Sequence, residues 1–354
     1  MSAVVDEARV EAFLGQILDE VGAAVNVPLA VIGARLGLYA AMADGQPVRP
    51  GELAARTGTH ERYVREWLAA QAAGGYVSYD PDAETYTLPI EHAAVLADET
   101  SPVYQGGMFQ TASAAIHAQD HVADRFRSGD GLGWHEHHDD LFHGTDAVFA
   151  LSYRASLVQE WIPALDGVEV KLQAGARVAD VGCGYGTATV LLAEAFPAST
   201  FVGFDYHPES IERARANAAA AGVEDRVRFE LGSATSYPGS EYDLVCCFDA
   251  LHDLGDPAGC AAHVRSTLAD DGTWLIVEPQ AGDRVEDNLH PLGRVRYAIS
   301  TLVCTPGSLS QPGRAGLGTL AGEARLSAAI RAGGFGQVRR AAETPYNMVL
   351  EARA

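Results

Sequence analysis

The chain has 354 residues, of which 47% are hydrophobic and 20% charged, a balance typical of folded globular proteins and too apolar for a disordered one. This length exceeds the size at which one hydrophobic core usually stops growing, so we expect more than one domain. The formal net charge of −22 disfavours nucleic acid as a partner, because phosphate backbones bind through Lys and Arg.

The N-terminal segment does not resemble a secretory signal. Residues 1–18 contain Asp6, Glu7 and Glu11 and lack a cationic start followed by an apolar run. We find no apolar stretch of the length needed to cross a bilayer. The cysteines are odd in number and lack C-x-x-C spacing, which disfavours disulfides and a zinc–cysteine site (Cys183, Cys246, Cys247, Cys260 and Cys304). We therefore expect a cytoplasmic protein with no membrane partner.

Residues 1–100 are expected to form a mainly helical winged-helix domain. Apolar residues recur at three- and four-residue spacing over about 10–43, which predicts a helix. A short helix near 48–58 is followed, after an N-cap at Thr59, by a second helix over about 60–73. Two strand-like runs on either side of residues 80–84 then predict a hairpin.

The charge of this domain argues against a role in DNA binding. It carries six basic and fifteen acidic residues, and its second helix interleaves Arg62 and Arg65 with Glu61 and Glu66. A DNA duplex would repel such a surface. We expect a dimerisation domain, and hence a homodimer.

Residues 101–170 are predicted to be a helical segment that links the domains and borders an acceptor pocket. A glycine-rich loop interrupts it and ends in a histidine-rich patch, where we expect Trp134 and His138 to contact a substrate. The patch lacks the i, i+4 histidine pair of known helical metal sites, so a solvated surface is favoured and a metal site is the alternative. Its members are His135, His137, His138, Asp139 and His143.

From residue 171 to 354, short apolar runs alternate with helical stretches, which predicts an α/β domain with a doubly wound, mostly parallel sheet. The expected strands are 178–181, 201–204, 227–231, 244–248 and 274–277, with two more from 338 onward and over 347–353. The expected helices lie near 186–196, 208–221, 257–268 and 322–333.

A glycine-rich turn follows the first of these strands. Gly182, Gly184 and Gly186 let the backbone turn tightly and let a ligand lie against it without meeting a Cβ. Asp180, at the end of the strand, suits a ligand with an ammonium group rather than a phosphate. Asp205 ends the next strand, where a carboxylate can accept hydrogen bonds from ribose hydroxyls.

Together these motifs resemble class I S-adenosylmethionine (SAM)-dependent methyltransferases. The set comprises the glycine turn, Asp205, Tyr242-Asp243-Leu244-Val245 and the run Gly272–Glu278, all in the family's order. The resemblance implies a Rossmann-like seven-stranded sheet and SAM as cofactor. The implied contacts are Asp180, Gly182, Gly184, Gly186, Asp205, Tyr206, Gly232, Ser233, Ala234, Phe248 and Asp249. The chain departs from the pattern at Ser233, where many relatives carry an Asp for the adenine amine, so the resemblance does not extend to this detail of adenine recognition.

After the fourth strand, the run from Phe248 to Pro257 resembles the His-Asp element of small-molecule O-methyltransferases, which also carry an N-terminal winged-helix-like domain for dimerisation. The resemblance implies that His252, next to Asp253, is the general base that takes the acceptor's proton. An imidazole titrates near neutral pH, which suits that role. His252 as a helix cap or packing residue is the plainer alternative.

An insert at about 284–318 is too long for a simple connection, and we expect it to form a lid or acceptor wall. Its candidate contributors are Asn288, His290, Arg294, Tyr297 and Cys304. Two alternatives to O-methylation stay open. One is a metal-assisted C-methyltransferase on a 2-oxo acid, with the metal bound by His252 and a second histidine such as His290. The other is a transcriptional regulator that keeps the methyltransferase fold as a ligand sensor.

Overall fold

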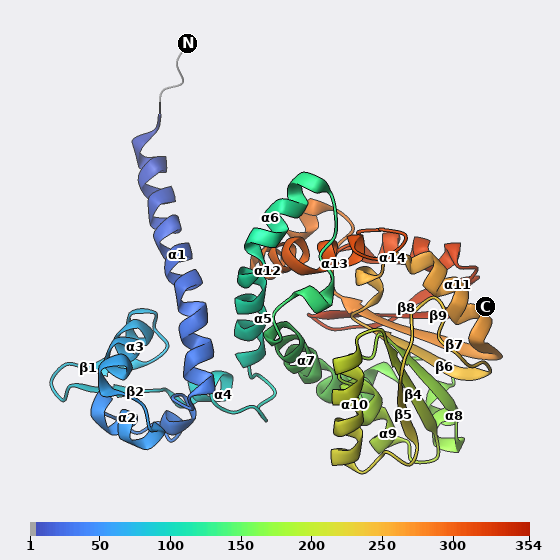
Figure 1. Ribbon diagram of the computed structural model, residues 1–354, viewed down its shortest axis with the longest axis horizontal. Helices are drawn as coiled ribbons and strands as arrows, with labels where there is room; N and C mark the ends of the chain where they lie inside the picture. The colour runs from blue at the N-terminus through green and yellow to red at the C-terminus, as the bar shows by residue number, and fades with distance from the viewer. Residues whose placement is uncertain (1–4) are drawn as a thin grey trace. The chain divides into compact units, whose positions relative to one another are not determined.

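The computed structural model describes residues 5–354, so the first four residues of the predicted N-terminal domain lie outside it. The chain divides into two compact units (Figure 1). Unit 1 contains the residues up to Ser113 together with 143–147, and unit 2 contains 114–142 and 148–354. The predicted middle segment, 101–170, is thus shared between the two units.

Unit 1 has the predicted winged-helix elements. Helices α2 and α3 form the helix-turn-helix, and strands β1 and β2 form the antiparallel hairpin, with Ser78 opposite Thr87. The N-cap of α3 is His60, whose ring accepts a hydrogen bond from the Arg62 amide, and not the expected Thr59. The elements are α1 (Glu7–Arg35), η1 (Ala40–Met42), α2 (Pro50–Thr57), α3 (Glu61–Ala73), β1 (Ser78–Asp80), β2 (Thr85–Thr87), α4 (Ile90–Leu96) and most of α5 (Gly106–His117).

Helix α1 corrects the expectation that no stretch could span a bilayer. By length and composition alone it is long and apolar enough, with an 18-residue window of mean hydropathy 1.5, of which 17% is buried. Large apolar side chains therefore lie exposed along the helix, including Phe13, Leu14 and Leu18 at 59%, 57% and 74% exposure. Exposed apolar surface of this extent is typical of an interaction surface.

Unit 2 contains the predicted seven-stranded sheet, and its strand order is β5-β4-β3-β6-β7-β9-β8. Strand β9 is antiparallel to both of its neighbours, and the remaining pairs are parallel. The carboxyl ends of β3, β4, β6 and β7 therefore meet at one edge, where ligands bind in such sheets. The strands are β3 (Arg177–Val181), β4 (Thr200–Asp205), β5 (Val227–Leu231), β6 (Tyr242–Phe248), β7 (Leu268–Pro279), β8 (Gln337–Glu343) and β9 (Asn347–Arg353).

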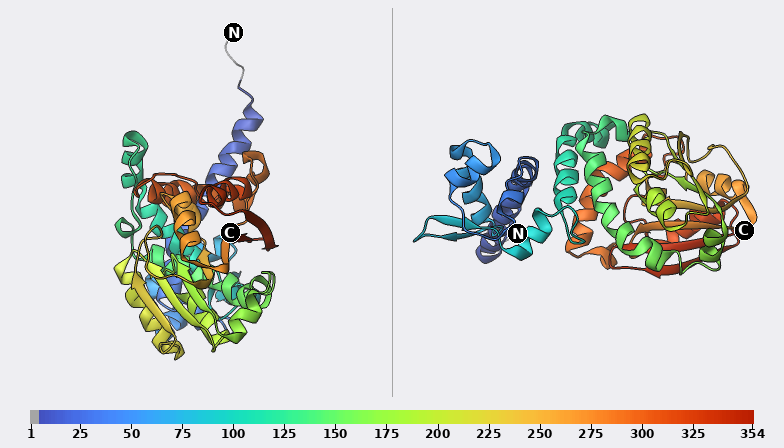
Figure 2. Two further views of the ribbon diagram at one scale, coloured as in Figure 1. Left: turned by 90° about the vertical axis from the view of Figure 1, so that its right-hand side faces the viewer. Right: turned by 90° about the horizontal axis from the view of Figure 1, so that it is seen from below.

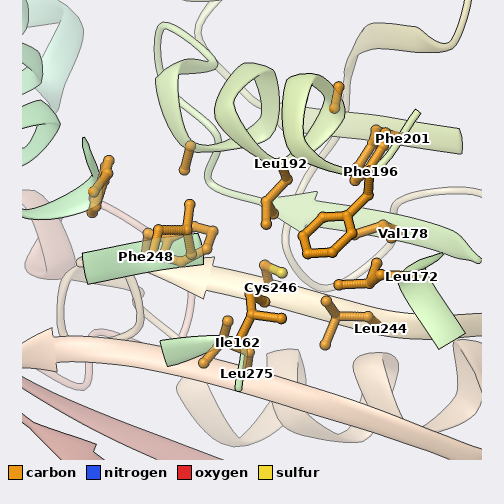
Figure 3. Packing of buried hydrophobic residues seen from close by; sticks show 14 of the residues in the cluster. Ile162, Leu172, Val178, Leu192, Phe196, Phe201, Leu244, Cys246, Phe248 and Leu275 are labelled. Carbon is orange, nitrogen blue, oxygen red and sulfur yellow. The ribbon is translucent and has the colours of Figure 1, made fainter. Parts of the chain in front are cut away.

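Helices cover both faces of this sheet, as Figure 1 and the two further views in Figure 2 show. Alternate residues of a strand enter different cores: Leu244 and Cys246 belong to one cluster and Val245 and Cys247 to the other. Figure 3 shows the first cluster, in which Leu192 of α9 and Phe196, the C-cap of this helix, pack onto the sheet. The helices that lie wholly or partly in unit 2, not all of them against the sheet, are α6 (Gln119–Ser128), η2 (Trp134–Glu136), α7 (Asp140–Ser152, with residues 143–147 in unit 1), η3 (Tyr153–Trp161), α8 (Val168–Ala174), α9 (Thr187–Ala195), α10 (Pro208–Ala221), η4 (Leu251–Asp253), α11 (Pro257–Thr267) and α14 (Gly322–Ala332).

The predicted insert is helical over most of its length. It comprises η5 (Val285–Asn288), α12 (Pro291–Ile299), η6 (Ser300–Cys304) and α13 (Thr305–Leu309), and the last three follow one another without a break. Its later part is tied to the segment after β6: the Ser308 hydroxyl donates to the Leu254 carbonyl at 2.8 Å, and the Gln311 amide donates to the Asp253 carbonyl at 2.8 Å. The insert thus holds the His-Asp element in place.

Candidate active site

The glycine turn between β3 and α9 has the geometry that its sequence predicts. Gly182, Gly184 and Gly186 have φ values of 77°, 53° and 75°, which favour glycine. A Cβ on Gly182 would lie 2.9 Å from the Ala250 Cβ, and one on Gly186 would lie 2.4 Å from the Phe229 ring. A Cβ on Gly184 would meet nothing within 4 Å. Gly184 therefore faces open space, where a ligand can lie against the backbone.

Asp180 lies beneath this turn at the end of β3, with 1% of its surface exposed. The Thr189 hydroxyl donates to its Oδ2 at 2.6 Å, whereas its Oδ1 has no hydrogen-bond partner in the described structure. Burial raises the pKa of Asp180 to about 7, partly opposed by the Thr189 hydrogen bond and aided by the nearby Asp205 charge. A buried carboxylate oxygen without a partner suits a cationic ligand group such as an ammonium.

Asp205, at the end of β4, holds the loop that follows it. Its Oδ2 accepts a hydrogen bond from the Gly184 amide at 3.0 Å and its Oδ1 accepts one from the His207 amide at 2.9 Å. Burial raises its pKa, while these two amide bonds lower it. A carboxylate has about four acceptor positions, so two remain for ribose hydroxyls. Asp205 thus orders the glycine turn and can also bind a ligand.

The remaining predicted cofactor contacts differ in what their side chains do. Tyr206 is 49% exposed and Ser233 is exposed, so both can face a ligand, and Gly232 and Ala234 flank Ser233 in the same loop. Phe248 is buried in the first core cluster against Tyr153, with ring centroids 5.3 Å apart (Figure 3). Only the backbone of Phe248 is left to contact a cofactor.

The side chain of Asp249 is occupied by protein partners. Its Oδ2 accepts from the Tyr153 hydroxyl at 3.0 Å and its Oδ1 from the Asn347 amide at 3.4 Å. Its φ of 50° is unusual for a residue other than glycine, and such backbone strain is concentrated at functional sites. Burial and the neighbouring Glu278 raise its pKa to about 7.

The imidazole of His252 is 2% exposed and lies between two carboxylates. Its Nδ1 is 2.5 Å from Glu278 Oε2, and its Nε2 is 3.2 Å from Asp253 Oδ1. Glu278 also accepts from the Leu251 amide at 2.8 Å, which fixes its position at the end of β7. Burial disfavours the charged ring, but Glu278 and Asp253 outweigh this effect and hold the pKa of His252 well above its usual value.

Asp253 is the more accessible member of the pair, with a side chain 13% exposed against 3% for His252. Its Oδ1 has no hydrogen-bond partner in the described structure. Burial raises its pKa, opposed by His252 and by hydrogen bonds from the Cys304 and Trp134 side chains. The Trp134 side chain, which lies in a loop of unit 2, thus contacts the His-Asp element.

The other predicted acceptor residues are less clearly placed at this site. Asn288 is buried and its side chain bonds to Gly282 and Arg284 within its own loop, so it stabilises the insert. His290 is the N-cap of α12, with Nδ1 accepting from the Gly293 amide. Arg294 is exposed on α12, and Tyr297 packs against the second core cluster.

In the histidine patch, the His138 ring lies 5.2 Å from the His117 ring, and its Nδ1 is 3.3 Å from Asp140. Among the described residues, the group of three or more possible metal ligands that comes together is not in this patch. It consists of His252, Asp253 and Cys304. The second metal ligand proposed from the sequence, His290, is not part of this group.

Sequence reasoning did not assign a role to Glu278, the carboxylate that holds His252. The signal was present, since Glu278 ends the last strand-like run of the family motif. Its partnership with His252 depends on β6 and β7 lying side by side, with Phe248 opposite Val277. That pairing places Glu278, near the end of β7, next to the segment that follows β6, although Glu278 and His252 are 26 positions apart.

Comparison with known proteins agrees with this geometry. Residues 172–301 match the methyltransferase domain family, and residues 23–98 match the Rv2258c-like winged HTH domain family. The chain is 36% identical to 27-O-demethylrifamycin SV methyltransferase of Amycolatopsis mediterranei over 39% of this chain and 43% of that protein. It is 29% identical to O-demethylpuromycin-O-methyltransferase of Streptomyces alboniger over 67% of this chain and 68% of that protein.

The fold is similar to that of human N-acetylserotonin methyltransferase in complex with SAM, with a TM-score of 0.72 at 16% identity. That match covers 100% of this chain and 99% of that one. A likeness at this identity concerns the fold alone. Three curated relatives that match at 32–36% identity are covered over only 24–48% of their own length.

Proposed function

The chain combines a methyltransferase domain with an N-terminal winged helix-turn-helix domain, and from this premise we propose that it methylates an oxygen of a small, largely apolar acceptor. The observation that carries the proposal is the pairing of a cofactor cradle with the buried His252–Glu278–Asp253 group at the same sheet edge. SAM, when bound, supplies an electrophilic methyl group: the acceptor oxygen forms a bond to its carbon as the C–S bond breaks, leaving S-adenosylhomocysteine (SAH).

Each part of the cradle has one task in this proposal. Asp180 pairs with the ammonium of the cofactor, because its buried Oδ1 lacks another partner. Asp205 accepts hydrogen bonds from the ribose hydroxyls while it holds the Gly184 amide. The exposed loop at Gly232–Ala234 borders the adenine.

His252 in its neutral form accepts the proton of the acceptor hydroxyl. Because Glu278 and Asp253 hold the pKa of His252 well above its usual value, this neutral form gains population as the pH rises. Glu278 holds Nδ1, so the nitrogen that can receive the proton is Nε2, on the side of Asp253. Asp253 must turn aside for the acceptor to reach it, and its greater exposure makes it the group able to do so. Positioning and proton transfer together account for the rate in this scheme, and a well-placed general base contributes about 10²–10⁴-fold.

A second candidate is metal-assisted methylation of a carbon next to a 2-oxo acid. One observation favours it, namely the convergence of His252, Asp253 and Cys304 as possible metal ligands. Assays of candidate acceptors with and without a chelator, followed by mass analysis of the methylated atom, separate the two reactions.

The first test is calorimetric titration of SAM and SAH into the wild type and Asp205→Asn. Micromolar binding that is weakened at least about tenfold in the variant supports the proposed cofactor site, since about 1.4 kcal/mol is lost with the ribose hydrogen bonds. Absence of binding in the wild type contradicts the proposal. Binding without transfer to any acceptor, combined with specific duplex binding, favours the ligand-sensing regulator instead.

His252→Ala tests the base. We expect kcat to fall about 10²–10⁴-fold while the affinity for SAH stays within about twofold, because the ring touches the acceptor and not the cofactor. Asp243→Asn is a matched control, since Asp243 bonds to the Arg177 amide at the far end of β6. An unchanged kcat in His252→Ala would show that the ring is structural.

We also propose that the chain is a cytoplasmic homodimer that uses α1 as its interface. Support comes from the exposed apolar side chains of this helix, which in a single chain lie in water. A second copy offers the same apolar surface, and a symmetric dimer needs only such self-complementarity.

A further inference from the structure

We propose that Nε2 of His252, the carboxylate of Asp253 and Sγ of Cys304 bind a divalent metal ion. One ligand atom from each lies within 4.8 Å of the others, and all three residues are buried. Two come from η4 and one from the end of η6, so segments about fifty positions apart in the sequence are brought together at this point.

The residues around this group are arranged as they are around metal ligands. A metal-binding histidine usually donates its other ring N–H to a carboxylate, which orients the ring. Glu278 lies 2.5 Å from Nδ1 of His252 and leaves Nε2 facing Asp253 and Cys304. The Thr319 hydroxyl donates to Cys304 Sγ at 2.9 Å, so the sulfur receives a hydrogen bond from outside the group.

The charges around His252 also point to a cation. Oδ1 of Asp253 is buried and lies 3.2 Å from Nε2 of His252, but the two atoms are outside hydrogen-bond geometry. A buried carboxylate is costly unless a positive charge meets it, and a metal ion supplies such a charge. The two carboxylates next to His252 also exceed the single positive charge that one imidazolium supplies.

The mixed nitrogen, oxygen and sulfur donors indicate which ions fit. Thiolate and imidazole favour Zn²⁺, Fe²⁺ or Co²⁺ over Mg²⁺ and Ca²⁺, which prefer oxygen alone. Three protein ligands leave at least one coordination position for a substrate atom, as in catalytic zinc sites.

This inference rests on the proposed function for its use and deepens it. An acceptor oxygen in the open position would lose its proton to solvent more easily, because a bound cation lowers the pKa of a coordinated hydroxyl. In the metal-loaded protein His252 is then a ligand, and deprotonation no longer depends on its ring. Acceptors with two adjacent oxygens, such as a catechol or an α-hydroxycarbonyl compound, are the class that such an ion would favour.

The test is a titration of the full chain with Co²⁺, followed by absorption spectroscopy. A cobalt–thiolate bond gives a charge-transfer band in the near ultraviolet, which a site without cysteine lacks. We expect the band in the wild type, its loss in Cys304→Ala, and its displacement by Zn²⁺. Cys260→Ala is the matched control, because Cys260 is a buried thiol of the second core cluster in α11, and it should keep the band.

Glu278→Gln is a further variant, for which we expect a partial effect. It keeps the shape of the side chain but removes the charge behind His252, so we expect metal affinity to fall about 10–100-fold without loss of the band at saturation. SAH binding, measured on every variant, shows that the fold and the cofactor site persist. A missing band in the wild type, or a band that survives in Cys304→Ala, overturns the inference.

The failure of this inference differs from that of the proposed function. If the protein shows no cobalt band and methyl transfer proceeds after chelation, the metal site is contradicted and the proposed methyltransferase function stands. If the protein shows a cobalt band but does not bind SAH, the metal site is supported and the proposed methyltransferase function is contradicted.

Discussion

Gly184 and Gly186 belong to the same turn but face different surroundings. Both have positive φ, which costs a residue with a Cβ about 1–2 kcal/mol. At Gly186 the Cβ would also collide with the Phe229 ring, whereas at Gly184 it would project into open space. One glycine therefore serves packing and the other serves ligand access.

We expect this difference to separate stability from binding. Gly186→Ala should destabilise the protein by about 2–4 kcal/mol, the sum of backbone strain and overpacking. Gly184→Ala should lose only about 1–2 kcal/mol but should weaken SAH binding markedly, because the new methyl group occupies the cradle. Denaturant unfolding and calorimetry on both variants check this, and equal effects of the two changes on SAH binding would contradict it.

We predict that Asp180 makes the affinity for SAH depend on pH. Burial raises its pKa to about 7, so below that pH the side chain is protonated and neutral, and above it the side chain is charged and can pair with an ammonium. We expect SAH to bind about tenfold more weakly at pH 6 than at pH 8, the slope of one linked proton below pH 7.

Asp180→Asn is the control for this prediction. Its side chain does not titrate, and the titration of the ligand itself is common to both proteins. Its affinity should be weak and nearly flat between pH 6 and pH 8. A parallel pH dependence in wild type and variant would show that another group is responsible.

At the scale of elements, the insert is bonded to its own unit, whereas α1 keeps apolar side chains exposed. The insert is anchored within unit 2 by Ser308 and Gln311, which bond to the segment after β6. Helix α1 instead keeps a long row of exposed apolar side chains. A helix that is apolar on its exposed side signals an interaction that a single chain does not satisfy.

Substitution in this row should change the oligomeric state. We expect Leu14→Asp combined with Leu18→Asp to convert a dimer into a monomer, because each buried leucine contributes about 1.5–3 kcal/mol to an interface. Size-exclusion chromatography with light scattering measures this, with Gln16→Glu on the same helix as the control. A wild-type monomer contradicts the dimer, and flotation of the wild type with lipid vesicles would assign α1 to a membrane surface.

At the scale of the whole molecule, the negative net charge disfavours DNA binding, which is the function that a winged helix suggests. The chain carries −22, and the two arginines of α3 are paired with glutamates on their own helix: Arg62 with Glu66 at 2.5 Å, and Arg65 with Glu61. Few free cations remain on that helix to meet phosphates.

We therefore expect no binding to a random DNA duplex at physiological salt, as measured by fluorescence anisotropy. Charge repulsion dominates non-specific association, so lowering the salt should not rescue binding. Arg62→Ala should leave the fluorescence anisotropy of the duplex unchanged. Binding that strengthens steeply as salt is lowered would contradict this and revive the regulator.

Much of the molecule follows from local patterns. The strands of unit 2, its helices and the wing hairpin are confirmed, because buried strands and amphipathic helices leave periodic apolar residues in the sequence. The positions of the glycine turn, Asp180 and Asp205 also follow from local patterns. Asp180 and Asp205 lie at the ends of β3 and β4, and the apolar residues that precede each of them identify its strand.

Only the tertiary structure determines which side chains surround His252. Glu278 reaches it because β6 and β7 are adjacent, and Cys304 reaches it because the insert folds back over η4. The same applies to Asn288, whose side chain turns into its own loop, and to Phe248, whose ring enters the core. Periodicity records which face of its own element a residue occupies. It does not record which distant side chain lies opposite, because that depends on strand order and on the path of a long insert.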